Sequence, residues 1–204
     1  DEDLARRLVE DLTGPGRGVL PEEEASVETP GDALVRELLA ERGWRPGEPW
    51  TPLRRDLVEP VEDPGVRVEV VGPGGARERA EVQRASFEGS TFTEERWREM
   101  AAGSPYALAR CLVARDERGE AVAAVTVWSA GPGRPGLLEP MGVRPEHRGR
   151  GHGRAITVAA AAALRELGAS SAVVCTPSTN VAAVATYESA GFRRLPEIHD
   201  LRRP

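Results

Sequence analysis

The chain has 204 residues, 40% of them hydrophobic and 29% charged, which is the composition of a globular protein with one substantial core and at most a small companion. The formal net charge is −6, and acidic residues are interleaved with the arginines. A nucleic-acid-binding domain would gather its basic residues on one face, so we expect no nucleic-acid partner. No apolar run reaches the roughly 20 residues that cross a bilayer, so we expect no membrane partner.

The N-terminal piece, 1–57, is predicted to be separate from the rest of the chain. It holds two amphipathic helices, at 4–12 and 32–42, and Gly43 ends the second. The proline-rich segment 58–65 follows and is predicted to be an inter-domain linker. The chain begins without the basic and then apolar segment of a signal peptide, which predicts a cytoplasmic protein.

The remaining residues, 66–204, alternate between strand and helix patterns and are predicted to form the second domain. Strands are predicted at 66–71, 107–115, 121–128, 136–143 and 171–176, with a final extended segment, and helices at 76–86, 93–102, 151–167 and 181–190. The order β-α-α-β-β-β-α-β-α-β indicates an α/β domain with a mixed sheet. Thr93 is placed to cap its helix, with two glutamates in the first turn.

A glycine-rich stretch, Arg148-Gly149-Arg150-Gly151-His152-Gly153, joins the strand at 136–143 to the helix that follows. The first turn of a helix has backbone N–H groups without internal partners and carries partial positive charge. Glycines let the backbone approach a phosphate closely. The stretch is therefore predicted to bind an anion such as a pyrophosphate.

The spacing of the glycines and the residues beside them distinguishes one kind of phosphate-binding loop from another. A Walker loop needs Gly-Lys-Ser/Thr, which a chain without lysine cannot supply. A dinucleotide fingerprint needs Gly-x-Gly-x-x-Gly, and counted from Gly149 its last position is Arg154. The pattern that fits is Arg/Gln-x-x-Gly-x-Gly/Ala. A nucleotide-binding oxidoreductase is therefore a distant alternative.

This pattern, after a strand that ends Val-x-Pro, resembles the acetyl-CoA signature of the GNAT superfamily of N-acetyltransferases. A second motif agrees, because the run from Asn180 to Phe192 opens a helix with Asn and places Tyr187 shortly before Gly-Phe. The resemblance covers about 66–200. It implies an α/β (α+β) GNAT fold, with a mixed and mostly antiparallel sheet splayed at the acyl-CoA site and helices on both faces.

The resemblance also implies acetyl-CoA as co-substrate, no metal, and transfer of its acetyl group to a primary amine of a small molecule or peptide. The residues expected at the donor are Met141, Gly142, Val143, Arg148, Gly149, Arg150, Gly151, His152, Gly153, Arg154, Asn180 and Tyr187. Asn180 and Tyr187 are seven residues apart, so both are expected on one helical face. A non-catalytic acyl-CoA sensor or scaffold is the alternative function.

Two catalytic residues are expected. Tyr187 matches the position from which GNAT-like enzymes protonate the departing thiolate, although a core tyrosine would look the same. An alkylamine is mostly protonated near neutrality and needs a base. Glu139 is the best-placed carboxylate, unless strand alternation turns it to the other face. Pro140 indicates an edge, bulge or opening, where a backbone N–H of Met141 or Val143 could bind the oxyanion.

Other candidates are weaker. Cys111 and Cys175 lie in apolar strand-like runs and are expected to be structural thiols, and no acetyl-thioester is expected at Cys175. The histidines have no metal-binding spacing. Three aromatic residues line either an acceptor pocket or the core: Phe87, Phe92 and Trp97.

The N-terminal piece resembles the closing half of a second GNAT-like domain, as in tandem-GNAT proteins. Its run from Leu34 to Trp44 echoes the run ending at Phe192, since both are helices that end in Gly-aromatic. Leu39 stands in the place of Tyr187, so such a copy would lack the donor site. The acceptor cannot be deduced from the sequence, and a homodimer is possible.

Overall fold

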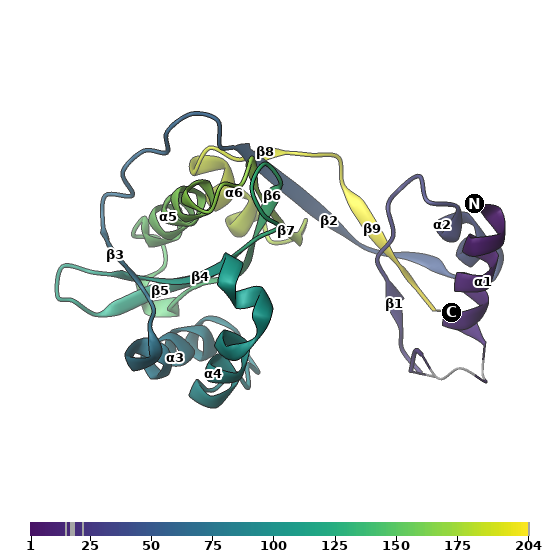
Figure 1. The fold of residues 1–204 in the computed structure, drawn as a ribbon, viewed down its shortest axis with the longest axis horizontal. Coiled ribbons are helices and arrows are strands. Elements are labelled where there is room, and N and C mark those ends of the chain that lie inside the picture. Colours follow the sequence, from purple (N-terminus) through teal and green to yellow (C-terminus); the bar gives the residue numbers. More distant parts are fainter. Residues whose placement is uncertain (15, 17–18, 22, 204) are drawn as a thin grey trace. The chain divides into compact units, whose positions relative to one another are not determined.

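The computed structural model describes residues 1–14, 16, 19–21 and 23–203 (Figure 1). Contacts divide the chain into two compact units. The first comprises Asp1–Pro52, Thr176–Asn180 and Pro196–Pro204, and the second comprises Leu53–Cys175 and Val181–Leu195. The division of the chain at 58–65 stays a prediction, and this segment has no helix or strand.

The first unit contains helices α1 (Glu2–Thr13) and α2 (Leu34–Glu41) and strands β1 (Ser26–Val27) and β9 (Ile198–Arg202), and strand β2 (Arg45–Asp56) begins in it. β9 pairs antiparallel with both β1 and β2. The buried apolar side chains of this unit are Ala5, Val9, Leu38, Leu39, Trp44 and Leu201. Both predicted helices are confirmed, whereas β1 and β2 were not predicted.

The sheet of the second unit has the order β3-β4-β5-β6-β7. Its strands are β3 (Arg67–Val70), β4 (Ala109–Arg115), β5 (Ala121–Ser129), β6 (Pro135–Val143) and β7 (Ser171–Pro177), the last of which runs on into the first unit. The first four pair antiparallel, and β6 pairs parallel with β7. The short β8 (Arg193–Arg194) pairs with the end of β2. The expected mixed, mostly antiparallel sheet is confirmed.

Helices cover both faces of this sheet (Figure 1). They are α3 (Ala76–Ser86), α4 (Glu94–Ala102), α5 (His152–Glu166) and α6 (Val181–Ser189), with short 3-10 turns η1 (Pro73–Gly75), η2 (Ser104–Leu108) and η3 (Pro145–His147). α5 lies on one face, and α3 and α4 lie on the other. Thr93 caps α4 as predicted, since its hydroxyl accepts the Arg96 N–H at 3.3 Å. In the part of the chain that is described, no helix is both long and apolar enough to cross a membrane.

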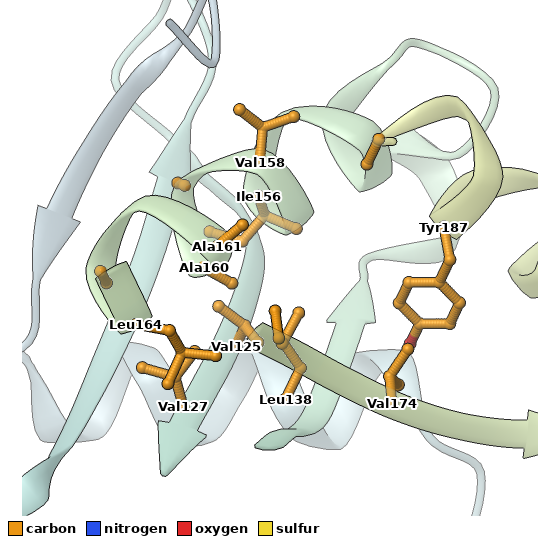
Figure 2. Close-up of a cluster of buried hydrophobic side chains, with 14 of the residues drawn as sticks. Val125, Val127, Leu138, Ile156, Val158, Ala160, Ala161, Leu164, Val174 and Tyr187 are labelled. Carbon is orange, nitrogen blue, oxygen red and sulfur yellow. The ribbon is translucent and has the colours of Figure 1, made fainter. Parts of the chain in front are cut away.

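The alternation of side chains along the strands builds one core on each face. On β4, Leu112 and Ala114 belong to the core under α5, whereas Cys111 and Val113 belong to the core under α3 and α4. This is the period of two that a strand buried on both faces requires. Figure 2 shows the first of these cores, to which α5 contributes mainly alanines. Small side chains let α5 lie close to the sheet.

Gly136 on β6 marks the closest approach of α5. A Cβ at this position would lie 2.4 Å from Leu164 Cδ2. The last turns of α5 are therefore seated directly on β6, and the opposite end of the helix lies where the glycine-rich loop leaves that strand.

Candidate functional site

Strands β6 and β7 separate partway along their length. Their paired residues run from Pro135↔Ser171 to Leu137↔Val173, whereas β6 continues to Val143. Within the described residues, the second half of β6 therefore pairs with β5 on one side and has no pair with β7 on the other, and we call this gap in the pairing the opening. This is the splay that the resemblance implied.

A bulge in β6 lies at the start of this opening. On β5, Val125 pairs with Met141 and Val127 pairs with Leu138, so the two residues Glu139 and Pro140 lie opposite the single residue between them. The Glu139–Pro140 peptide bond is cis. The irregularity predicted from Pro140 is confirmed.

Trp128 on β5 forms a hydrogen bond with this bulge. The sequence did not predict this contact. The Trp128 indole Nε1–H donates to the Glu139 carbonyl oxygen at 2.9 Å. Only the pairing of β5 with β6 brings the two residues together, so no local sequence pattern predicts the bond.

Backbone N–H groups of β6 point into the opening. The Arg144 N–H donates to the Val122 oxygen on β5 at 2.9 Å. Because N–H directions alternate along a strand, those of Val143 and Met141 point away from β5, toward the side where β7 has separated. These are the two N–H groups that the sequence suggested for an oxyanion.

The glycine-rich loop ends at the first turn of α5. Gly149 and Gly151 have φ values of +72° and +83°, in the left-handed region that favours glycine. The Ala155 N–H donates to the Gly151 oxygen at 3.0 Å, so the N–H groups of the three residues between them precede the first helical bond. The loop from Arg148 to Gly151 is exposed. N–H groups without helical partners at the start of a 15-residue helix suit a phosphate anion.

Two further glycines allow close packing around this loop. A Cβ on Gly142 would lie 2.5 Å from the Cβ of Ser86 at the end of α3. A Cβ on Gly153 would lie 3.0 Å from Thr186 Cγ2 on α6. Both positions therefore fix neighbouring helices against the site.

Arg148 braces the loop. Its guanidinium donates to the Val143 oxygen at 3.3 Å and to the Ser86 oxygen at 3.0 Å. These bonds join the end of β6 to the end of α3. The side chain therefore holds the loop in place, and the predicted contact of Arg148 with the donor stays a prediction.

Arg150 in the loop and Arg154 in the first turn of α5 differ in their contacts. Arg154 donates to the Ser189 oxygen at 3.0 Å and reaches Glu62 at 3.4 Å. Arg150 is exposed, and its side chain has no hydrogen bond or ion pair with the described residues. Arg150 is therefore the cation of the loop that is free to meet an anionic ligand.

Tyr187 is buried beside the opening. Its side chain is 6% exposed, and Figure 2 shows its ring reaching from α6 toward Val174 on β7. Burial, and secondarily the negative charge of Glu139, raise the pKa of Tyr187 to about 12. Its phenol is therefore protonated at neutral pH, as a proton donor must be, and the raised pKa makes it a weaker acid than an ordinary tyrosine. Glu139 is itself exposed.

Asn180 directly precedes α6, and its backbone N–H donates to the Pro177 oxygen at 2.9 Å. It belongs to the first unit and Tyr187 belongs to the second. The helical face that these two residues were expected to share at the acetyl-CoA site stays a prediction.

Two histidines flank the loop. The rings of His147 and His152 are 6.0 Å apart. Burial, and then the charge of His147, lower the pKa of His152, which favours its neutral form. Oxygens of Asp116 and Glu120 and a nitrogen of His147 lie within 4.8 Å of one another, an arrangement that could hold a metal ion. Asp116 Oδ1 already accepts two N–H groups of its own turn, which accounts for its position.

The two cysteines differ in burial. Cys111 is fully buried, as expected of a structural thiol, but Cys175 is exposed. The expectation of a structural thiol in an apolar setting is wrong for Cys175. Along β7, Val174 and Thr176 are buried, so alternation turns the residue between them outward.

Comparison with known proteins identifies the fold. The sequence profile of the Acetyltransferase (GNAT) family matches residues 77–192. A crystal structure of a GCN5-related N-acetyltransferase from Sphaerobacter thermophilus superposes with a TM-score of 0.68 at 21% identity, over 88% of this chain and 58% of that one. A tandem GNAT protein from the clavulanic acid biosynthesis pathway superposes with a TM-score of 0.60 at 17% identity, over 88% of this chain and 62% of that one.

A curated relative matches a shorter segment. A mycothiol acetyltransferase from Thermobispora bispora is 46% identical over 59 residues, which are 29% of this chain and 20% of that protein. The chain thus spans less than two thirds of the length of each of these relatives. The family profile covers more than half of the chain, and the splayed sheet and the glycine-rich loop lie within or beside the matched residues. The chain therefore belongs to the GNAT family of acetyltransferases.

Proposed function

We propose that this chain transfers an acetyl group from acetyl-CoA to a primary amine. The observation that carries the proposal is the opening between β6 and β7, with the first turn of α5 at the end of β6 and the protonated Tyr187 beside it. An anion site, backbone N–H donors and a proton donor are the parts that thioester aminolysis needs.

The residues at the opening and the glycine-rich loop fit acetyl-CoA, the acetyl donor. The exposed N–H groups of Gly149, Gly151 and the first turn of α5 suit its pyrophosphate, and Arg150 adds a cation. The N–H groups of Met141 and Val143 suit the acetyl oxygen, on which negative charge develops during the reaction. The separated strands suit a narrow, extended pantetheine arm.

The reaction needs two proton transfers. Glu139 accepts a proton from the acceptor ammonium, directly or through water, and so frees the nitrogen lone pair. The nitrogen forms a bond to the acetyl carbon, the carbon–sulfur bond breaks, and its electrons go to sulfur. Tyr187 gives its proton to the thiolate, and the second proton of the amine, carried by solvent, returns to the phenolate of Tyr187.

The proposal is tested by following free thiol released from acetyl-CoA in the presence of a panel of primary amines, with mass spectrometry of the products. We expect thiol release that depends on the amine and a product heavier by one acetyl group. Tight binding of acetyl-CoA without release for any amine would favour a non-catalytic acyl-CoA sensor instead.

A cytoplasmic location, a homodimer and the absence of nucleic-acid and membrane partners stay predictions. Cell fractionation and sedimentation of the purified chain measure the first two.

A further inference from the structure

A buried arginine lies beneath the sheet on the face covered by α3 and α4. Arg79 is only 1% exposed. Its Nη1 donates to Gln83 Oε1 at 2.8 Å and its Nη2 donates to Thr126 Oγ1 at 3.2 Å. Its Nε is buried and has no hydrogen-bond partner among the described residues. This guanidinium therefore has unused donors in a place that water does not reach.

The buried charge also lacks a carboxylate partner. Within the part of the chain that the structure describes, Arg79 makes no ion pair, and the side chains that favour its charged form electrostatically are those of Cys111 and Tyr106. Burial lowers the pKa of Arg79. Burying an unpaired cation at this position costs more desolvation free energy than burying an apolar side chain. The arginine is thus poorly explained by packing, and perturbed groups of this kind gather at functional sites.

The location of this guanidinium links it to the proposed reaction. Thr126, which accepts from Arg79, is the β5 residue opposite the bulge formed by Glu139 and Pro140. The Thr126 hydroxyl lies 3.2 Å from the thiol of Cys111, a member of the core under α3 and α4. Arg79 therefore lies next to the bulge on that face of the sheet.

Aromatic side chains connect the bulge to the buried arginine. Trp128, which bonds the Glu139 carbonyl, makes an edge contact with Tyr106, and their ring centroids are 6.3 Å apart. Tyr106 in turn meets Trp97 at 6.0 Å. The row of rings therefore starts at the Glu139 carbonyl, and Tyr106 within it interacts electrostatically with Arg79.

One of the side chains that contact Arg79 belongs to a loop. The Phe92 ring centroid lies 5.8 Å from the Arg79 Cζ atom. Phe92 belongs to the connection between α3 and α4, residues 87–93, which has no helix or strand, and its side chain is half-buried. Phe92 is therefore one of the groups that contact the guanidinium, and it lies on a loop outside the sheet.

We propose that Arg79 binds a carboxylate of the acceptor, so that the preferred acceptor is an amine that also carries a carboxylate. This inference rests on the proposed acetyl transfer and names its substrate class. The Nε–H and the remaining Nη–H groups form the planar fork that matches a carboxylate. The Phe92 ring moves aside as the acceptor enters, and the ammonium group lies toward Glu139.

Binding tests this inference without turnover. The probes are glycine, β-alanine, 4-aminobutanoate and 6-aminohexanoate, each paired with its primary amide, in thermal melts of the acetyl-CoA complex at constant ionic strength. We expect at least one carboxylate to raise the melting temperature of the wild type more than its amide does. Arg79→Met should abolish that difference, and Arg77→Met, an exposed arginine of the same helix, should keep it.

The same variants distinguish a binding role from a structural one. Replacing an unpaired buried cation by an apolar side chain is expected to leave the melting temperature equal or higher. Arg79→Lys keeps the charge and should retain part of the carboxylate preference. It also serves as the test variant if Arg79→Met does not fold. Equal protection by each carboxylate and its amide in the wild type, or an unchanged preference without Arg79, would overturn the inference.

Turnover separates this inference from the proposed function. In thiol-release assays, kcat/KM is measured for each carboxylate and for its amide. Dividing the first value by the second removes any general change in activity that a substitution causes. We expect Arg79→Met to lower this ratio by about 10-fold or more. If simple alkylamines are acetylated and the ratio does not change, acetyl transfer stands and the role of Arg79 is wrong. If carboxylates protect the fold through Arg79 but no amine releases thiol, the binding site stands and the proposed function fails.

Discussion

The phenol of Tyr187 is buried within electrostatic reach of the carboxylate of Glu139, and burial together with that negative charge raises the pKa of Tyr187 to about 12. The two residues lie on different elements, α6 and β6. One is held protonated and the other is exposed to solvent. This difference is consistent with the proposed roles of Tyr187 as proton donor and Glu139 as proton acceptor.

The raised pKa predicts a loss of stability at alkaline pH. An unfolded tyrosine titrates near 10, so the stabilisation is fully present below about pH 10 and is lost as the pH rises toward 12. From pH 9 to 11.5 this amounts to about 2 kcal/mol of unfolding free energy. Denaturant unfolding at both values should show Tyr187→Phe losing less stability than the wild type by that amount, and equal losses would contradict the shift.

Glu139→Gln should lower kcat/KM at pH 7 by about 100-fold or more, because the amine then has no base. The loss should shrink at pH 9.5, where more of the amine is already free of its proton. Rates of thiol release at both pH values measure this. Glu166→Gln, an exposed glutamate at the end of α5, is the matched control. A Glu139→Gln enzyme with wild-type activity at pH 7 would exclude this base.

Gly151→Ala should weaken donor binding. The φ of +83° strains any residue with a Cβ, at a cost of about 1 kcal/mol, and relief of that strain would turn the N–H groups at the start of α5 away from the anion. Calorimetry of acetyl-CoA binding should show a Kd raised by about 10-fold. Gly74→Ala is the control, because Gly74 has open space around it and no left-handed φ. Unchanged affinity in Gly151→Ala would place the phosphates elsewhere.

Trp128→Phe should slow the reaction while the fold persists. The change removes the N–H that holds the Glu139 carbonyl but keeps an aromatic ring beside Tyr106. One such bond contributes about 1 kcal/mol, and its loss should lower kcat about 5-fold or more by freeing the bulge. Steady-state kinetics and a melting curve measure both effects. A fall in melting temperature with unchanged kcat would show that Trp128 only packs.

Local patterns predicted most of the second unit. Helix 76–86 and the start of helix 181–190 match the structure at the residue, because apolar periodicity and capping residues are read within one element. The glycine-rich loop was recognisable for the same reason, since its conformation depends on a few adjacent residues. The bulge at Pro140 followed from the missing N–H.

Features that depend on distant residues were not predictable. Strand β2 contains Pro46, Pro49 and Pro52, and each weakens a strand pattern, yet pairing with β9 secures the first two, with a register shift between them. The sequence pattern did not predict the burial of Arg79, because an arginine on an amphipathic helix is normally exposed. The bond from Trp128 to Glu139 required the register of two strands.

The central claim is acetyl transfer at this site, with Tyr187 as the proton donor. The most direct measurement compares single-turnover thiol release by the wild type and Tyr187→Phe at saturating acetyl-CoA, with donor affinity measured in parallel. We expect a rate lower by about 100-fold or more at unchanged affinity, since the departing thiolate then lacks its acid. Wild-type turnover in Tyr187→Phe with intact donor binding would contradict this account.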